Sequence, residues 1–268
     1  MNLQIFTQEQ FTKWLSTYER QAYYTFDVEP TEPELSELGF DLVSLKFDGQ
    51  LGVGYVEQVD SNGSLHILLH SRTRQFKRRV VINSVPGAIP QGSVLFGESI
   101  VGTNWAVSSK WRDLYFPFDI LTKDTQFSER AEFLRTVVRP YISWSPLRTF
   151  GSVLTYLQPE RGDFEGVCFA QSDDRSPLPV FGRYKKGIEL SGVIVGFDPG
   201  EGKYSGQVGS IRLRLVSGVV TTCSGFDDSI RLDMTQRPEF YLHKEVEITA
   251  SRLFPSGLPR HPQFKRFK

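Results

Sequence analysis

The chain has 268 residues, and its 31 Lys and Arg residues balance 31 Asp and Glu residues to a formal net charge of zero. Hydrophobic residues make up 39% and charged residues 23%, which excludes general disorder, and the length suggests about two domains. No apolar run is long enough to span a membrane, and the first ten residues do not resemble a signal peptide. Zero net charge by itself argues against a nucleic-acid partner, because phosphate contacts usually require a basic excess.

Composition also limits the chemistry. Two cysteines, Cys168 and Cys223, cannot form a disulfide framework, so we expect a cytoplasmic protein, or a viral protein acting in the host cytoplasm. The four histidines show no zinc-ligand spacing, and no GxSxG hydrolase elbow or GxGxxG dinucleotide-binding turn is present. The segment GEGKY at 200–204 lacks the Ser or Thr that follows the lysine of a P-loop.

The charges are unevenly distributed along the chain. Residues 27–41 carry six acids and no base. Residues 71–80 carry five bases and no acid, and so do the last eighteen residues. Each block is compatible with a solvated surface, but two basic blocks beside an active site would favour an anionic partner.

Two helices are expected, the first at 7–20. Its apolar residues recur at helical spacing: Phe11, Trp14, Leu15 and Tyr18. Thr7 begins a capping-box pattern at its start. The acidic stretch 27–39 is expected to be a connector. The second helix is expected at 128–139, capped by Ser128.

Short apolar runs separated by Gly, Asn, Ser and Pro indicate strands from Phe40 onward, with a hairpin turn at 61–64. Further strands are expected near 165–170 and 177–185. Residues 190–268 are expected to be almost entirely short strands and turns, with about the length of a small five-stranded barrel.

Five short motifs follow one another in this β-rich part. None is specific alone, but their order and spacing make coincidence improbable. They are KFDG at 46–49, LFGES at 95–99, YFPFDI at 115–120, FEGV at 164–167 and RYK at 183–185.

This series resembles the ordered motifs of the covalent nucleotidyltransferase superfamily, which comprises DNA ligases, RNA ligases and mRNA capping enzymes. The resemblance covers about residues 40–187. Three segments of the tail resemble the oligonucleotide-binding (OB) barrel of ATP-dependent DNA ligases: GEGKYSGQVGS at 200–210, CSGFDDSIR at 223–231 and GLPRHPQFKRF at 257–267. The chain is therefore similar to a minimal ATP-dependent DNA ligase.

The resemblance implies an α+β fold in two domains. Residues 1–188 would form a nucleotidyltransferase (adenylation) domain of antiparallel sheets with flanking helices, and residues 189–268 a C-terminal OB-fold β-barrel. The implied activity is ATP-dependent sealing of 5′-phosphate/3′-hydroxyl nicks. AMP would pass from ATP to a lysine and then to the DNA 5′-phosphate, and it would leave when the 3′-hydroxyl attacks. We expect a monomer that binds nicked duplex DNA and no membrane.

The resemblance assigns the nucleophile to Lys46. A free lysine titrates near pH 10.4, so attack near pH 7 requires its pKa to fall by about 3, which corresponds to roughly 4 kcal/mol. Arg183 and Lys185, on one face of a strand at i, i+2, would lower that pKa and hold the α-phosphate charge.

Five further motif residues would bind the nucleotide or a metal. Phe118 would stack on adenine, and Glu98 would hydrogen-bond the ribose. Glu165, together with Glu98, would bind Mg²⁺ or Mn²⁺ near the α-phosphate. Asp48 would orient the loop or the lysine, and Gly49 would allow close backbone approach.

The basic blocks would contact DNA. Arg72 lies in a Ser-Arg-Thr segment that resembles a phosphate-contacting strand of ligases, and it is assigned to the nucleotide as well. The expected DNA contacts are Arg72, Arg74, Lys77, Arg78 and Arg79 in the first block, and Arg260, Lys265, Arg266 and Lys268 in the second.

Three positions depart from the family pattern. DNA ligases usually carry Arg two residues after the motif glycine, where Leu51 stands here, so one sugar contact is missing or comes from elsewhere. The first lysine of the last motif is replaced by Arg183. The terminal R-x-D-K element, which touches the β,γ-phosphates in the family, is absent, and Arg266 or Lys268 would have to replace it.

Three alternatives stay open. An RNA ligase shares the KxDG, FGES and FDI segments, although the complete barrel favours DNA. A capping guanylyltransferase would use GTP. A non-catalytic nucleic-acid-binding module could keep the scaffold, but retention of Lys46, Glu98, Glu165 and Lys185 argues against loss of activity.

Overall fold

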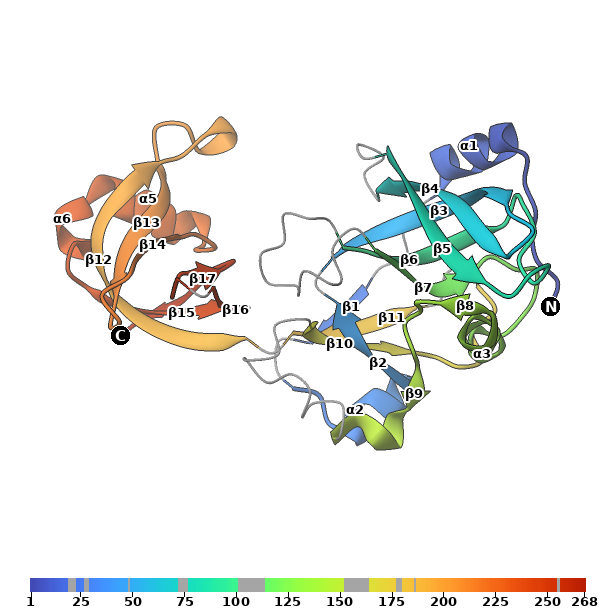
Figure 1. Ribbon diagram of the computed structural model, residues 1–268. Coiled ribbons are helices and arrows are strands. Elements are labelled where there is room, and N and C mark those ends of the chain that lie inside the picture. Colours follow the sequence, from blue (N-terminus) through green and yellow to red (C-terminus); the bar gives the residue numbers. More distant parts are fainter. Residues whose placement is uncertain are drawn as a thin grey trace. The chain divides into compact units, whose positions relative to one another are not determined.

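The structure is a computed structural model. It describes residues 1–18, 23–26, 29–47, 49–71, 77–100, 114–151, 164–176, 180–185, 187–254 and 256–268, without the side chains of Tyr23 and Lys77. The chain divides into two compact units, Met1–Lys185 and Lys186–Lys268 (Figure 1). Among the described residues, no helix has the length and apolar character needed to cross a membrane.

Two sheets form the first unit. One contains β1 (Tyr23–Phe26), β2 (Leu42–Phe47), β9 (Ser145–Pro146), β10 (Phe164–Ala170) and β11 (Phe181–Tyr184), in the order β1-β11-β10-β2-β9. The other contains β3 (Gln50–Val59), β4 (Ser64–Ser71), β5 (Lys77–Ser84), β6 (Val94–Ser99), β7 (Tyr115–Ile120) and β8 (Val138–Arg139), in the order β7-β6-β3-β4-β5-β8. In the described part of the chain, the strands of these two sheets pair antiparallel, except that β1 pairs parallel with β11.

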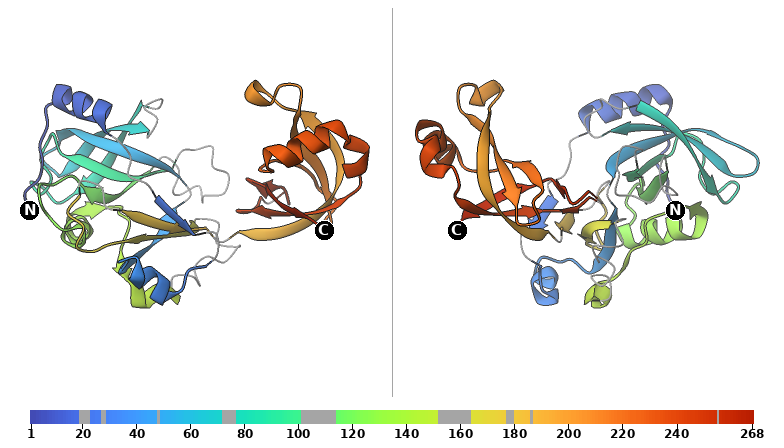
Figure 2. Two further views of the ribbon diagram at one scale, coloured as in Figure 1. Left: turned by 180° about the vertical axis from the view of Figure 1, so that it is seen from behind. Right: turned by 60° about the vertical axis from the view of Figure 1, so that its left-hand side comes forward.

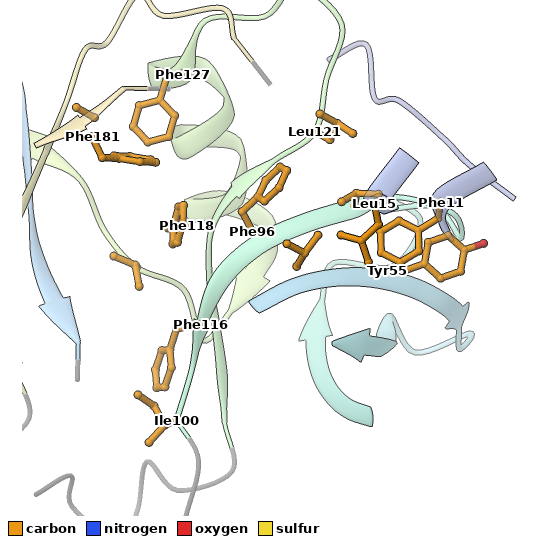
Figure 3. Packing of buried hydrophobic residues seen from close by; sticks show 14 residues of the cluster. Phe11, Leu15, Tyr55, Phe96, Ile100, Phe116, Phe118, Leu121, Phe127 and Phe181 are labelled. Atoms are coloured by element: carbon orange, nitrogen blue, oxygen red, sulfur yellow. The ribbon is translucent and has the colours of Figure 1, made fainter. Parts of the chain in front are cut away.

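An apolar layer lies between the two sheets. Phe96, Phe116 and Phe118 from the six-stranded sheet and Phe181 from the five-stranded sheet belong to it (Figure 3). Burial of one such ring contributes about 1.5–3 kcal/mol. This layer holds together the two sheets that carry the expected site residues.

Helix α1 (Gln8–Thr17) lies against the six-stranded sheet (Figure 2). Its expected capping box is confirmed, since Thr7 and Gln10 exchange side-chain and backbone hydrogen bonds. The helix ends at Thr17, before the expected residue 20. Phe11 is buried and stacks on Tyr55 of β3, with ring centroids 4.9 Å apart.

The acidic stretch contains a helix, α2 (Glu32–Glu37), and the expectation of a plain connector is wrong. Thr31 and Glu34 form a second capping box, in which the Thr31 amide donates to the Glu34 carboxylate at 2.7 Å. Leu35 is fully buried against the five-stranded sheet, which anchors this short helix. The Thr-x-x-Glu pattern was the overlooked signal.

Helix α3 (Phe127–Val137) confirms a helix in the expected place, but Ser128 does not cap it. The Phe127 amide donates to the Asp174 carbonyl at 2.8 Å, and the Ser128 amide donates to the Ser172 carbonyl at 2.9 Å. A segment distant in sequence therefore satisfies the helix N-terminus, which local sequence cannot reveal.

The second unit is built on a five-stranded sheet. It contains β12 (Ile188–Pro199), β13 (Val208–Leu215), β14 (Val220–Cys223), β15 (Glu245–Ala250) and β18 (Gln263–Phe267), in the order β14-β13-β12-β15-β18. A two-stranded sheet pairs β16 (Arg252–Leu253) with β17 (Pro259–Arg260).

The second unit also contains α5 (Asp228–Gln236) and α6 (Pro238–Tyr241), so the expectation of almost only strands and turns is wrong here. Arg231 occupies a buried position of α5, with its guanidinium 3.8 Å from the Tyr204 ring centroid. A charged residue at a core position hides the helical pattern of apolar residues.

Candidate functional site

Lys46 lies near the end of β2, and its side chain is only 17% exposed. Its ammonium donates to Oε1 of Glu165 on the neighbouring strand β10. Strict alternation would place Glu165 on the opposite face, because Gly166 is the residue that pairs with Lys46. A β-bulge between Phe164 and Gly166 adds one residue to β10 and turns the Glu165 carboxylate toward the lysine.

The second oxygen of Glu165 accepts a hydrogen bond from Lys185, which follows β11, at 2.9 Å. Gly166 makes this arrangement possible, because a Cβ at that position would lie 2.0 Å from the Tyr184 carbonyl oxygen. The glycine that follows the glutamate therefore allows β10 and β11 to pair closely enough to bring the two charges together.

The pKa of Lys46 lies above its ordinary value. Burial lowers this pKa, but the nearby carboxylates of Glu98 and Glu165 raise it by more. The expected lowering by Arg183 and Lys185 is wrong for the protein chain by itself, since the Lys185 ammonium is already paired with Glu165. This shift favours the protonated form of Lys46.

Glu98 comes from β6 of the other sheet, and its Oε1 accepts a hydrogen bond from the Gly49 amide at 3.1 Å. Burial raises the pKa of Glu98 to about 7, although the Lys46 charge opposes this effect. Leu51 of β3 pairs directly with Glu98, so the position that is Arg in DNA ligases sets an apolar side chain beside this carboxylate. A buried carboxylate with a pKa near neutrality is typical of functional sites.

Ser44 and Cys168 share the face of the five-stranded sheet that carries Lys46, and sequence analysis did not identify them. Cys168 pairs with Ser44 on one side and with Arg183 on the other. Alternation along β2 and β10 was the available signal. Burial raises the pKa of Cys168 to about 11, so its thiol is neutral. Arg183 Nε donates to Thr25 Oγ1 at 3.1 Å.

Phe118 lies on β7 with 9% of its surface exposed. Its ring meets that of Phe181 from β11 edge to face, with centroids 5.6 Å apart (Figure 3). The two rings thus join the two sheets. Stacking of Phe118 on adenine stays a prediction.

Residues 72–76 of the first basic block, including Arg72 and Arg74, lie outside the described residues, and so does Asp48. Lys77 begins β5, but its side chain is not described. Arg78 and Arg79 follow it on the same strand. Arg79 forms a two-pronged ion pair with Glu57, with contacts of 2.8 and 3.2 Å.

Acids of β15 and β12 pair with the bases of β18. Arg266 Nε donates to Glu247 at 2.7 Å, and Lys265 lies between Glu189 and Glu247. Burial raises the pKa of Glu247, but the hydrogen bond and charge of Arg266 and the charge of Lys265 lower it by more. This pairing could not be seen in the sequence, where the last eighteen residues contain no acid.

The other two C-terminal bases assigned to DNA, Arg260 and Lys268, have different surroundings. Lys268 Nζ donates to Ser191 Oγ at 2.7 Å. Arg260 of β17 is half-buried, and burial lowers its pKa. Contact of these bases with DNA stays a prediction.

The clustered side chains fit a nucleotide and a hard divalent ion. Glu98 and Glu165 supply the oxygen ligands that Mg²⁺ and Mn²⁺ prefer, and Lys46 and Lys185 supply cations for phosphate. Among the described residues, no group of three or more His, Cys, Asp and Glu could hold a metal alone. Close packing needs Gly49, where a Cβ would lie 2.7 Å from the Ser99 carbonyl oxygen.

Comparisons with known proteins agree with the resemblance to DNA ligases. Residues 199–268 match the family model described as DNA ligase OB-like domain. No curated protein sequence matches the chain. A structure described as "DNA binding with a minimal scaffold: Structure-function analysis of Lig E DNA ligases" aligns with a TM-score of 0.62 at 18% identity, covering 92% of this chain and 98% of that chain.

The chain has the fold of a DNA ligase. Two further structures support this at 17% identity. "Pmar-Lig_PreS3" has a TM-score of 0.58 and covers 97% of this chain and 70% of its own, and "Pmar-Lig_Pre." has a TM-score of 0.57 and covers 92% and 67%. The α+β fold with a C-terminal OB-like domain, expected from the sequence, is confirmed. So is the resemblance to minimal DNA ligases, at the level of fold.

Proposed function

We propose that this protein is an ATP-dependent DNA ligase that seals 5′-phosphate/3′-hydroxyl nicks in duplex DNA through a lysyl-AMP intermediate and a DNA-adenylate. The observation that carries the proposal is the meeting of motif side chains from different strands: Lys46 of β2, Glu98 of β6, Glu165 of β10 and Lys185 after β11. Buried charges are expensive, and clusters of them with perturbed pKa values are typical of functional sites.

The two parts of the chain would have different roles. We assign adenylation to residues 1–188 and DNA binding by an OB-fold to residues 189–268, in a protein that acts as a monomer. The match of residues 199–268 to the DNA ligase OB-like domain supports DNA as the partner.

In the first step, Lys46 Nζ would attack the α-phosphorus of ATP, so that an N–P bond forms as the bond to pyrophosphate breaks. The ammonium must first give its proton to solvent. Phosphate oxygens would pair with Lys185 and Arg183, while Glu165 and Glu98 would hold a divalent ion. Bound Mg²⁺ or Mn²⁺ would supply positive charge beside the α-phosphate, which lowers the pKa of a neighbouring ammonium.

The remaining residues would orient the nucleotide. Glu98 would hydrogen-bond the ribose, and Phe118 would stack on the base. Asp48 and Arg72, which lie outside the described residues, would orient the lysine and contact phosphate. The basic residues of β5 and β18 would contact the DNA backbone. Such contacts position the protein on the duplex but give no sequence specificity.

The experiment is incubation with ATP labelled at the α-phosphate, with Mg²⁺, followed by denaturing electrophoresis. The wild type should carry a covalent label, and Lys46→Ala and Lys46→Arg should not, because a guanidinium keeps its proton. Lys123→Ala, which removes an exposed lysine, is the matched control and should label normally. Equal labelling of Lys46→Ala would refute the assignment of the nucleophile.

Labelling and nick-sealing assays together separate the alternatives. Labelling by GTP in place of ATP would indicate a capping guanylyltransferase. A preference for a nick in an RNA duplex over one in a DNA duplex would indicate an RNA ligase. Absence of any covalent nucleotide on the wild type would indicate a non-catalytic nucleic-acid-binding module.

A further inference from the structure

Arg130 of α3 is a buried charge that the proposed chemistry does not use. Its side chain is 1% exposed, and its fork binds Asp119 of β7, which is fully buried. Arg130 Nε donates to Asp119 Oδ1 at 2.8 Å, and Nη2 donates to Oδ2 at 3.1 Å. Asp119 directly follows Phe118, the ring expected to meet the base.

The third guanidinium nitrogen of Arg130, Nη1, contacts the segment that connects β10 and β11 of the five-stranded sheet. Nη1 donates to the Thr125 carbonyl at 2.5 Å and to the Asp174 carbonyl at 3.4 Å. Asp174 lies between β10 and β11, and its carboxylate accepts the Val180 amide at 3.0 Å. β11 begins at the next residue, Phe181.

The candidate site is divided between these two sheets. Glu98 and Phe118 belong to the six-stranded sheet, and Lys46, Glu165 and Arg183 belong to the five-stranded sheet. Apolar contacts alone let two sheets shift against each other more easily than hydrogen bonds do. A site that is divided between two sheets therefore needs hydrogen bonds that fix their relative position. Displacement of catalytic groups by about 1 Å can cost about 100-fold in rate.

We propose that Arg130 is a positioning residue for nucleotide binding. By linking β7 to the segment that leads into β11, it sets the separation of Phe118 and Glu98 from the cations of the five-stranded sheet. This inference rests on the proposed ligase function, because it concerns the same site.

The test compares full-length variants at a temperature where all are folded. The unfolding temperature of the first unit is followed by tryptophan fluorescence, because all four tryptophans precede residue 186. The apparent KM for ATP and the maximal rate constant, here called kcat, are obtained from single-turnover self-adenylation at several ATP concentrations. Arg130→Met should lower the unfolding temperature and raise KM by about tenfold or more. Arg135→Met, at an exposed position of the same helix, should change neither.

Two variants separate positioning from stability. In the double variant Asp119→Leu with Arg130→Met, no buried charge is left unpaired, so the unfolding temperature should recover toward the wild type. KM should stay raised, because the bonds to Thr125 and Asp174 are still missing. Arg130→Lys keeps a charge for Asp119 but cannot reach all three partners, so it should raise KM with little change in kcat.

A KM that returns to the wild-type value together with stability, or a wild-type KM in folded Arg130→Lys, would show that Arg130 is only structural. If the double variant does not fold, Arg130→Lys alone decides. A wild type without any covalent nucleotide would instead remove the proposed function, and this inference with it.

Discussion

The Glu165 carboxylate of β10 accepts a hydrogen bond from the Lys46 ammonium of β2, and a β-bulge in β10 makes that contact possible. The other carboxylate oxygen is taken by Lys185. One carboxylate thus holds both lysines of the proposed adenylation chemistry, and a divalent ion that binds Glu165 must compete with them.

This competition predicts a gain of metal affinity in Lys185→Met. Removing one ammonium frees one oxygen of Glu165, and an ion pair of this exposure is worth up to about 1 kcal/mol, or about fivefold in affinity. Binding of Mn²⁺ to the protein without nucleotide, followed by electron paramagnetic resonance, should therefore tighten. Lys123→Ala should leave it unchanged. Weaker binding in Lys185→Met would mean that Lys185 supports the metal site.

Gly166→Ala should destabilise the first unit by about 1–3 kcal/mol, because its Cβ would overlap the Tyr184 carbonyl of β11. Gly151→Ala is the control, since nothing lies within 4 Å of a Cβ there. Urea unfolding followed by tryptophan fluorescence measures both variants. Equal stability of Gly166→Ala and the wild type would contradict the close pairing of β10 with β11.

Glu247→Gln should make the second unit less stable at neutral pH but not in acid. The pKa of Glu247 in the folded protein lies below the ordinary value of 4.5, so its ion pairs stabilise above pH 4.5 and are lost as pH falls through the folded pKa. The stability difference between variant and wild type should therefore shrink below pH 4.5. Circular dichroism during urea unfolding at several pH values measures it.

The control for this prediction is Glu239→Gln, at an exposed position of α6. Its stability difference from the wild type should not vary with pH. A constant difference for Glu247→Gln as well would mean that the contacts with Arg266 and Lys265 contribute nothing.

DNA binding should weaken steeply with salt despite the zero net charge. If Lys265 and Arg266 both contact phosphates, the double variant to Ala should lower the slope of log K against log salt by about 2. Fluorescence anisotropy with a nicked duplex measures the slope. An unchanged slope together with lower stability would show that these bases serve only their ion pairs with Glu189 and Glu247.

Most of the strand framework could be predicted from sequence, because alternation and turn residues act locally. The capping boxes at Thr7 and Thr31 are equally local, although the second was overlooked. Local sequence predicts Ser128 as a cap, but the carbonyls of Ser172 and Asp174, more than forty residues away, accept from the helix N-terminus instead.

The sequence by itself determined the order of the motifs and therefore which residue types reach the candidate site. Only the tertiary structure decided which charges meet. It turned Glu165 toward Lys46 through a bulge, and it raised the pKa of Lys46 where a lowered value was expected. It also paired the bases of an acid-free tail with Glu189 and Glu247. The physical reason is that charges interact through space, over distances set by strand pairing, and separation along the chain does not encode those distances.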